Sequence, residues 1–287
     1  MKSIPYSAIL FILLPFSGFS NGYSTHSNTD TVRVANAQEF INAIGSNRVI
    51  ELSADTFFLD NIKVNESSPT KSKVIDEGIQ ILKASNLEIL GAGTKKKPTV
   101  IGFKNKRNTV LTFKECNNIR LVNIEVDLLS TNDIRREAGF LSFEKSENIT
   151  VINCTLSGNG SFGIICSEAK NLKIRKTTIS KTLSAMLILK ESSDLVFEDC
   201  FFTSNKSNGH LVVSENCHAV QFVKCVFDKN YPDKSSGEYM PEKDFVFLFS
   251  NEKPSAGFLL DRCTFPNNKI KKLTNKPEIF TLKETKF

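Results

Sequence analysis

Two consecutive stretches of this chain match position by position at a separation of 23 residues. The first, GIICSEAKNLKIRKTTI, begins at Gly163, and the second, MLILKESSDLVFEDCFF, begins at Met186. An interval of this length is typical of a solenoid, in which each repeat is one small unit and successive units stack. The repeat therefore constrains the fold more than any other feature of the sequence.

A small polar residue followed by an aliphatic residue marks each repeat. These anchor residues are Asn86, Asn118, Asn148, Asn171 and Asp194, at intervals of 32, 30, 23 and 23 residues, and His218 continues the series. Mostly apolar residues recur seven and five positions before each anchor, one and three positions after it, and six and eight positions after it. Each repeat thus holds three short segments of period-two alternation, the pattern of half-buried β-strands.

Three short strands cannot bury their own inner faces, so the repeats must stack on one another. Stacking at the usual strand spacing of about 4.8 Å would place each inward side chain above its counterpart in the previous repeat. The sequence therefore predicts an all-β fold, a single parallel β-helix with three-strand coils and a minimal period of 23 residues.

The chain divides into four predicted segments. Residues 1–20 carry one lysine and a short apolar run, which indicates a secretory signal peptide cleaved near Ser20 and a secreted or periplasmic protein. A linker (21–31), the β-helix domain (32–265) and a C-terminal tail or cap (266–287) follow. Within the domain, residues 36–44 have one apolar helical face, and we expect this helix to cap the first coil.

The repeated phrase GI-x-C/L-x₄-N-L-x-I resembles the right-handed parallel β-helix superfamily, which includes pectate lyases and polygalacturonases. The resemblance covers roughly residues 32–265. It implies that the anchor asparagines form a ladder in which Asn148 is buried. It also implies that a substrate would lie along the outer face of one sheet, between loops inserted between coils.

Seven cysteines in a chain with a signal peptide raise the question of disulfides. The repeat places Cys154, Cys200, Cys225 and Cys263 in one inward column, and Cys166 in another. Side chains stacked in parallel rarely reach the torsion that a disulfide needs, so the sequence predicts buried free thiols. No CxxC pair accompanies the three histidines, and no metal site is predicted.

The outward positions of the first strand of each coil carry one carboxylate, Glu144. Glycoside hydrolysis needs a pair of carboxylates, and a calcium-dependent lyase needs several acidic ligands and a base. The sequence identifies neither set, so no catalytic residue is assigned. The same face carries predicted outward apolar residues, which suggest contact with a partner. They are Phe140, Ile165, Met186, Ile188 and Val212.

Three insertions interrupt the repeats, at Asn65–Glu77, Asp127–Ala138 and Asp228–Asp244. The last two insertions each connect the third strand of one coil to the first strand of the next coil. Both should therefore project over the same edge of the sheet that the first strands form, with a groove between them. The candidate binding residues of this groove are Asp133, Arg135, Arg136, Glu137, Glu144, Lys190, His210, Tyr231, Glu238 and Tyr239.

Two functions fit these features. The preferred hypothesis is non-catalytic binding of a polysaccharide or another surface partner along one sheet face, without a cofactor. The alternative is a polysaccharide lyase or glycoside hydrolase acting on an acidic polysaccharide, and only a lyase would call for Ca²⁺. The formal net charge of +6 is dispersed along the chain, and neither nucleic acid nor a membrane span is expected. The sequence leaves the oligomeric state open.

Overall fold

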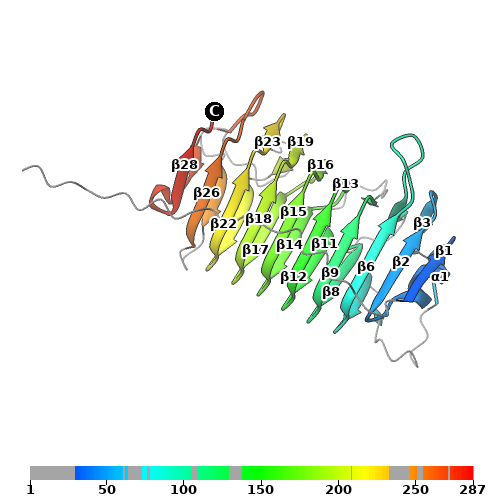
Figure 1. Ribbon diagram of the computed structural model, residues 1–287. Helices are drawn as coiled ribbons and strands as arrows, with labels where there is room; N and C mark the ends of the chain where they lie inside the picture. Colours follow the sequence, from blue (N-terminus) through cyan, green and yellow to red (C-terminus); the bar gives the residue numbers. More distant parts are fainter. Residues whose placement is uncertain are drawn as a thin grey trace, which may run out of the picture.

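The computed structural model describes residues 30–60, 62–63, 73–75, 78–104, 109–128, 138–207, 209–232, 246–250, 255–270 and 272–286. These residues form a right-handed parallel β-helix, a long stack of coils seen from the side in Figure 1. Each full coil gives one strand to each of three sheets, named A, B and C, and the chain passes from C to A to B. The predicted fold class is confirmed.

The described residues supply the following strands. Sheet A contains β1 (Asp30–Val34), β2 (Arg48–Leu52), β6 (Ser85–Gly91), β9 (Asn117–Val122), β12 (Glu147–Ile152), β15 (Lys170–Arg175), β18 (Ser193–Glu198), β22 (His218–Val223), β26 (Ala256–Asp261) and β28 (Phe280–Lys283). Sheet B contains β3 (Thr56–Phe58), β7 (Val100–Phe103), β10 (Glu125–Leu128), β13 (Thr155–Gly158), β16 (Thr178–Ser180), β19 (Phe201–Thr203) and β23 (Val226–Asp228). Sheet C contains β4 (Lys73–Ile75), β5 (Gly78–Leu82), β8 (Leu111–Lys114), β11 (Gly139–Glu144), β14 (Phe162–Ser167), β17 (Ala185–Lys190), β21 (His210–Glu215), β25 (Val246–Ser250) and β27 (Lys272–Thr274). A small sheet D pairs β20 (Lys206–Ser207) with β24 (Tyr231–Pro232), and β4 is antiparallel to β5.

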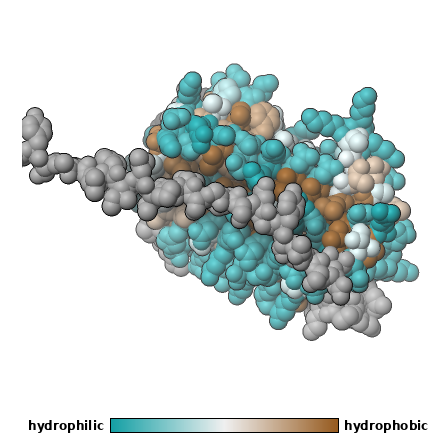
Figure 2. Space-filling model, in the orientation of Figure 1, coloured by the Kyte–Doolittle hydropathy of each residue, from teal (hydrophilic) through white to brown (hydrophobic). Residues whose placement is uncertain are grey.

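The core is a set of vertical columns of inward side chains. Identical positions of successive coils lie over one another, so the rings of Phe202 and Phe227 stack at 4.7 Å, and those of Phe227 and Phe265 at 4.6 Å. All three are buried. The outward positions are mainly polar, and Figure 2 shows a largely hydrophilic surface interrupted by separate hydrophobic patches.

The two ends of the stack differ. At the N-terminal end, α1 (Ala37–Ala43) begins at Asn36, whose side chain accepts a hydrogen bond from the Glu39 amide, and buries Phe40 and Ile41. The predicted capping helix at 36–44 is confirmed. At the opposite end in Figure 1, residues 272–286 add one more coil through β27, the 3₁₀ turn η2 (Pro277–Ile279) and β28. The C-terminal segment therefore lies on the end of the stack and does not fold back along sheet C.

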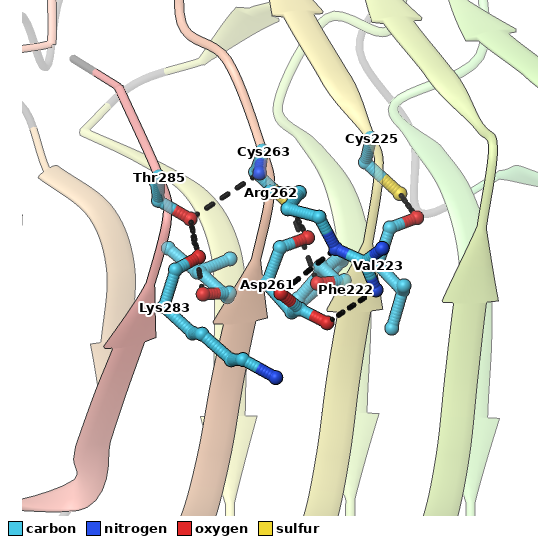
Figure 3. A network of polar contacts seen from close by, with 9 residues as sticks. Phe222, Val223, Cys225, Asp261, Arg262, Cys263, Lys283 and Thr285 are labelled. Atoms are coloured by element: carbon cyan, nitrogen blue, oxygen red, sulfur yellow. Dashed lines mark hydrogen bonds and ion pairs between the residues drawn. The ribbon is translucent and has the colours of Figure 1, made fainter.

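The predicted thiol column is confirmed, and all seven cysteines are free and buried. Each thiol of the column donates to backbone carbonyls of its own and the preceding coil. Cys225 Sγ, for example, lies 3.5 Å from Val223 O and 3.3 Å from Phe197 O. Thr285 occupies the equivalent position in the last coil and accepts from the Cys263 amide (Figure 3). These contacts satisfy polar groups that stacking would otherwise bury unpaired.

Beside this column, Asp261 and Arg262 form a bidentate ion pair (Figure 3), with 2.8 Å from Arg262 Nη2 to Asp261 Oδ2. This hydrogen bond holds the pKa of the Asp261 carboxyl below its usual value, and Lys283 and Lys224 add to the effect. A carboxyl with a depressed folded-state pKa stabilises the fold above its unfolded pKa, and this contribution is lost as the pH falls through the folded value.

We therefore expect Asp261→Asn to lower the urea midpoint at pH 6, because the variant cannot be ionised. The difference from the wild type should shrink below about pH 4, where the wild-type carboxyl also becomes neutral. Urea titrations between about pH 2 and 6 measure it. A gap that stays constant over this range would show that the charge of Asp261 does not stabilise the fold.

The predicted anchor ladder exists, but it lies on the surface. Asn118 Nδ2 donates to Asn86 Oδ1 (2.7 Å), and Asn171 Nδ2 donates to Asn148 Oδ1 (2.6 Å). All four residues have left-handed backbone angles, and their side chains are solvent-exposed or half-buried. The expectation that Asn148 is buried is therefore wrong, because the left-handed turn directs the amide outward.

The anchor of one coil is displaced by one residue from its predicted position. In the coil that contains β22, the residue aligned with Asp194 is Ala219, which has a left-handed backbone (φ 54°). The predicted anchor, His218, is the residue directly before it. The coil therefore contains one more residue before its anchor than the sequence pattern indicated. Its first strand, β21, is shifted by one position as a result.

This shift reverses the direction of three side chains in β21. Val212, which was predicted to face outward, and Ser214 are buried and align with Leu187 and Leu189 of the preceding coil. Val213, which was predicted to face inward, faces outward and is half-buried. A slip of one residue moves every side chain of a strand to the other face.

A second correction concerns the residues just ahead of the inward pairs in sheet C. Phe140 and Met186 were predicted to face outward, but both are fully buried. In the equivalent position of a later coil, the Phe247 ring lies 4.8 Å from the ring of the core residue Phe227. Both residues lie at the start of their strands, where consecutive side chains are buried before the alternation begins. The apolar strip on the outer face of sheet C is therefore smaller than predicted.

Candidate functional site

The outer face of sheet C changes from polar to apolar along the stack. One column of outward residues runs through Gln80, Thr112, Ser142, Ile165, Ile188, Val213 and Phe249. The side chains of Ile165, Ile188, Val213 and Phe249 are half-buried. The apolar part of sheet C thus covers four successive coils and ends at an aromatic ring.

His210 extends this apolar strip. Its imidazole stacks on the Phe249 ring, with 4.2 Å between centroids and 11° between planes. The Ser207 hydroxyl accepts from the His210 amide (2.9 Å) and donates to the His210 carbonyl (2.5 Å), which fixes the turn into β21. Burial lowers the pKa of His210, and its Nδ1 has no hydrogen-bond partner among the described residues. Burial thus favours the neutral form of the imidazole, which adds a flat ring to the strip.

A second outward column of sheet C carries charge. It runs through Leu82, Lys114, Glu144, Ser167, Lys190 and Glu215. Glu144 Oε2 lies 3.5 Å from Lys114 Nζ, so its carboxylate is held in an ion pair. Lys190 is exposed between Ser167 and Glu215.

A buried ladder of amides lies where the chain turns from sheet B to sheet C. Asn230 Oδ1 accepts from Asn205 Nδ2 (3.0 Å), and Asn230 Nδ2 donates to Asn268 Oδ1 (2.9 Å) and to the Phe202 carbonyl (3.1 Å). Thr182 completes the ladder by donating to Asn205 Oδ1. Because Asn205 and Asn230 are fully buried and hydrogen-bonded on both sides, this turn has the same geometry in successive coils.

The residue that follows each asparagine of the ladder points outward in a stack. Lys206 pairs with Tyr231 across sheet D, and the Lys269 amide donates to the Asn230 carbonyl one coil further on. Tyr231 therefore lies between two lysines, with a coil spacing of about 4.8 Å. Both lysines are exposed, and no carboxylate of the described residues lies within 4 Å of either ammonium group. We call Lys206, Tyr231 and Lys269 the B–C corner.

The ten candidate residues predicted from sequence separate into three groups. Tyr231 belongs to the B–C corner, and His210 begins β21 four residues after Lys206, on the coil before that of Tyr231. Glu144 and Lys190 lie on the charged column of sheet C. The others lie outside the described residues and stay predictions: Asp133, Arg135, Arg136, Glu137, Glu238 and Tyr239.

Lys206 and Lys269 were not predicted as binding residues, although the sequence contains a signal for them. The phrase Phe-x-x-Asn followed by Lys or Tyr occurs as FTSNK, FDKNY and FPNNK, ending at Lys206, Tyr231 and Lys269. The phenylalanine belongs to the core stack, the asparagine to the buried ladder, and the last residue to the corner. The intervals of 25 and 38 residues hid this pattern from a search based on a constant period.

The described part of the chain contains no cluster of three or more His, Cys, Asp or Glu side chains able to hold a metal ion. None of its helices is both long and apolar enough to cross a membrane. The predicted signal peptide lies outside the described residues.

Comparison with solved structures finds the same architecture at low sequence identity. The rice weevil pectin methyl esterase has a TM-score of 0.54 at 14% identity, with 92% of this chain and 82% of that chain covered. A glycoside hydrolase has a TM-score of 0.54 at 8% identity, with 85% and 51% covered. ORF18 of Geobacillus virus E2 has a TM-score of 0.52 at 16% identity, with 81% and 49% covered. This chain thus spans about half the length of the last two proteins.

No curated protein sequence matches the chain. At the sequence level, the model of the family described as "Right handed beta helix region" matches residues 99–270, which is more than half of the 287 residues. The matched segment begins just before β7 and ends before the last coil, and it contains the thiol column, the buried amide ladder and the B–C corner. The chain belongs to the right-handed β-helix family.

Proposed function

We propose that this protein binds an acidic polysaccharide without cleaving it, along the B–C corner and the adjoining apolar strip of sheet C. The observation that carries the proposal is the Lys206–Tyr231–Lys269 stack, in which two cations that have no acidic partner among the described residues flank an aromatic residue. The three structural relatives include a pectin methyl esterase and a glycoside hydrolase by name, and at their low identity they support only the fold.

The arrangement suits an extended, anionic sugar chain. The ammonium groups of Lys206 and Lys269 would pair with carboxylates of successive sugar units, and the Tyr231 ring would pack against a pyranose face. His210 and Phe249 would extend the apolar surface on the same side. The buried amide ladder fixes the backbone of the corner before binding, so little conformational entropy is lost on association.

Catalysis is the second candidate, and it depends on groups beyond the B–C corner. The carboxylates proposed for a groove, such as Asp133 and Glu238, lie outside the described residues, and Glu144 is paired with Lys114. A lyase would release unsaturated sugars from the same polymer that the corner is proposed to bind. The extracytoplasmic location of the protein, inferred from residues 1–20, belongs to the proposal as well.

The test is a titration with polygalacturonate at about 0.05 M and 0.5 M NaCl, with the ultraviolet absorbance of unsaturated products followed in parallel. We expect the K206A/K269A variant to bind at least about fivefold more weakly at low salt, since each exposed ion pair contributes up to about 1 kcal/mol. The matched control is K170A/K173A, which removes the same charge from β15 on sheet A.

If both double variants weaken polygalacturonate binding equally, the loss follows from the lower overall charge of the protein. That result would refute the corner as the binding site. A wild-type protein that binds duplex DNA more tightly than polygalacturonate would refute a polysaccharide as the partner. Formation of unsaturated product would replace the binding function with lyase activity.

A further inference from the structure

The outer face of sheet B has a chemical character opposite to that of the B–C corner. Its first outward column runs through Val100, Glu125, Thr155, Thr178, Phe201, Val226 and Thr264. Its second outward column runs through Gly102, Asp127, Ser157, Ser180, Thr203 and Asp228. Between Val100 and Thr264 neither column contains a lysine or an arginine, and Lys286 follows Thr264 in the first column at the C-terminal end of the stack. We call these two columns the hydroxyl face.

One aromatic ring stands out from this face. Phe201 is 37% exposed, and it is one of two large hydrophobic side chains that are exposed among the described residues. It lies between Thr178 and Val226 of the neighbouring coils, both of which have shorter side chains. The ring is therefore accessible from the side facing solvent, and it offers a flat apolar surface of the kind that packs on sugar rings.

Several hydroxyl groups of this face make no side-chain hydrogen bond to another described residue, whereas the Thr203 hydroxyl beside Phe201 lies 3.3 Å from the Ser204 hydroxyl. Thr155, Ser157 and Thr178 make no side-chain hydrogen bond in the described part of the chain. They occupy neighbouring coils about 4.8 Å apart, and positions two residues apart on a strand are separated by about 6.6 Å. The face thus presents a regular array of free donors and acceptors.

Two carboxylates complete the array at the end opposite Phe201. Glu125 and Asp127 project from the same side of β10, and both are half-buried. A side chain at Gly158 would lie 2.5 Å from Asp127 Oδ1, so the glycine leaves open the space that this oxygen faces. Burial raises the pKa of both carboxyls, and the charge of Asp127 raises that of Glu125 further. From Glu125 to Phe201 the face spans three coil steps, about 14 Å.

We infer that the hydroxyl face is a second glycan site, which takes a neutral, polyhydroxylated polysaccharide. Phe201 would pack against one sugar ring, the free Ser and Thr hydroxyls would exchange hydrogen bonds with sugar hydroxyls, and Asp127 would accept from a further hydroxyl. The carboxylates of Glu125 and Asp127 repel a uronate chain, and the charge of Lys181 near Asp127 offsets this repulsion in part. Charge therefore distinguishes the ligand of this face from the ligand of the B–C corner.

The experiment measures binding of the full chain to hydroxyethyl cellulose, a soluble uncharged β-glucan. We expect Phe201→Ala to weaken this binding at least about fivefold, as truncation of an aromatic anchor does. Thr178→Val, which keeps the shape and removes the hydroxyl, should also weaken it. Val223→Ala on the outer face of sheet A is the matched control and should bind like the wild type.

Salt and the corner variant separate the two sites. Binding of the neutral glucan should be unchanged at about 0.5 M NaCl and in K206A/K269A, because it involves no ion pair. The inference is overturned if the wild type does not bind the neutral glucan, or if F201A binds it as tightly as the wild type. Loss of glucan binding in K206A/K269A would also overturn it, by placing both ligands at one site. Failure of the acidic polysaccharide to bind leaves these outcomes unchanged.

Discussion

Replacing Phe227 with alanine is expected to lower the free energy of unfolding by about 3–5 kcal/mol, the largest stability effect of any single substitution considered for this protein. Phe227 is fully buried, stacks on Phe202 and Phe265, and meets Phe247 edge-on at 4.8 Å. Truncation would open a cavity that touches three coils. The stack is close-packed and hydrogen-bonded along its length, so it can collapse only in part.

A urea titration followed by circular dichroism measures this effect, and Val226→Ala is the matched control. Val226 is the preceding residue of the same strand, but its side chain is half-buried on the outer face, so we expect a loss below about 1 kcal/mol. In a stacked fold each coil is stabilised by its neighbours, so the cavity should also speed hydrogen exchange in residues 246–286. Similar losses in the two variants would contradict the inward stack.

Asn230→Ala is expected to lower the free energy of unfolding by about 2–4 kcal/mol and to weaken binding at the corner. The substitution removes the acceptor of Asn205 Nδ2 and the donor to Asn268 Oδ1 and to the Phe202 carbonyl. The Asn205 amide and the Phe202 carbonyl are buried where water cannot replace the lost partner, while Asn268 is half-buried, and each buried polar group left unpaired costs about 1–3 kcal/mol. Tyr231 follows directly and would lose its fixed position.

Urea denaturation and the polygalacturonate titration test both parts of this prediction. The control is Asn171→Gly, which suits the left-handed backbone at this position and removes an asparagine side chain from the ladder at the surface, where its 2.6 Å hydrogen bond to Asn148 is exposed to solvent. We expect a change of less than about 1 kcal/mol and unchanged binding for this control. Equal losses of stability and of binding in the two variants would contradict the claim that the buried ladder stabilises the fold and positions the corner.

The repeat in the sequence is sufficient to predict most of the fold. Alternating apolar residues at fixed distances from each anchor identify the inward columns, and the helix at Ala37–Ala43 follows from its apolar face and the Asn36 cap. The buried thiols follow from the same columns, because cysteine behaves as a small hydrophobic residue when it is enclosed. These features depend on local periodicity, which a single sequence contains.

Two features of the fold could not be predicted in the same way. The displaced anchor occurs because Ala219, which is not a residue that favours a left-handed backbone, occupies that conformation in the stack. Phe140 and Met186 are buried because consecutive side chains pack inward at the start of β11 and β17, before the strand alternation begins. Both depend on how a coil closes on its neighbours, and tertiary packing determines that closure.

The candidate site was predictable in part. Tyr231 and His210 are predicted from their places near an insertion and at the start of a strand, and they lie on adjacent coils, Tyr231 in the corner and His210 against Phe249. The lysines of the corner follow core phenylalanines at a constant offset of four residues, so the phrase itself could have revealed them. The hydroxyl face gives no comparable signal, since serine and threonine are ordinary strand residues and only the register shows that their hydroxyls are adjacent.

A crystal structure of the protein with a short oligogalacturonide tests the central claim most directly. We expect one sugar ring to lie on Tyr231, with its carboxylate and that of the next sugar within hydrogen-bond distance of Lys206 and Lys269. An oligosaccharide bound elsewhere on the coils, with this tyrosine and both lysines open to solvent, would contradict the proposed function.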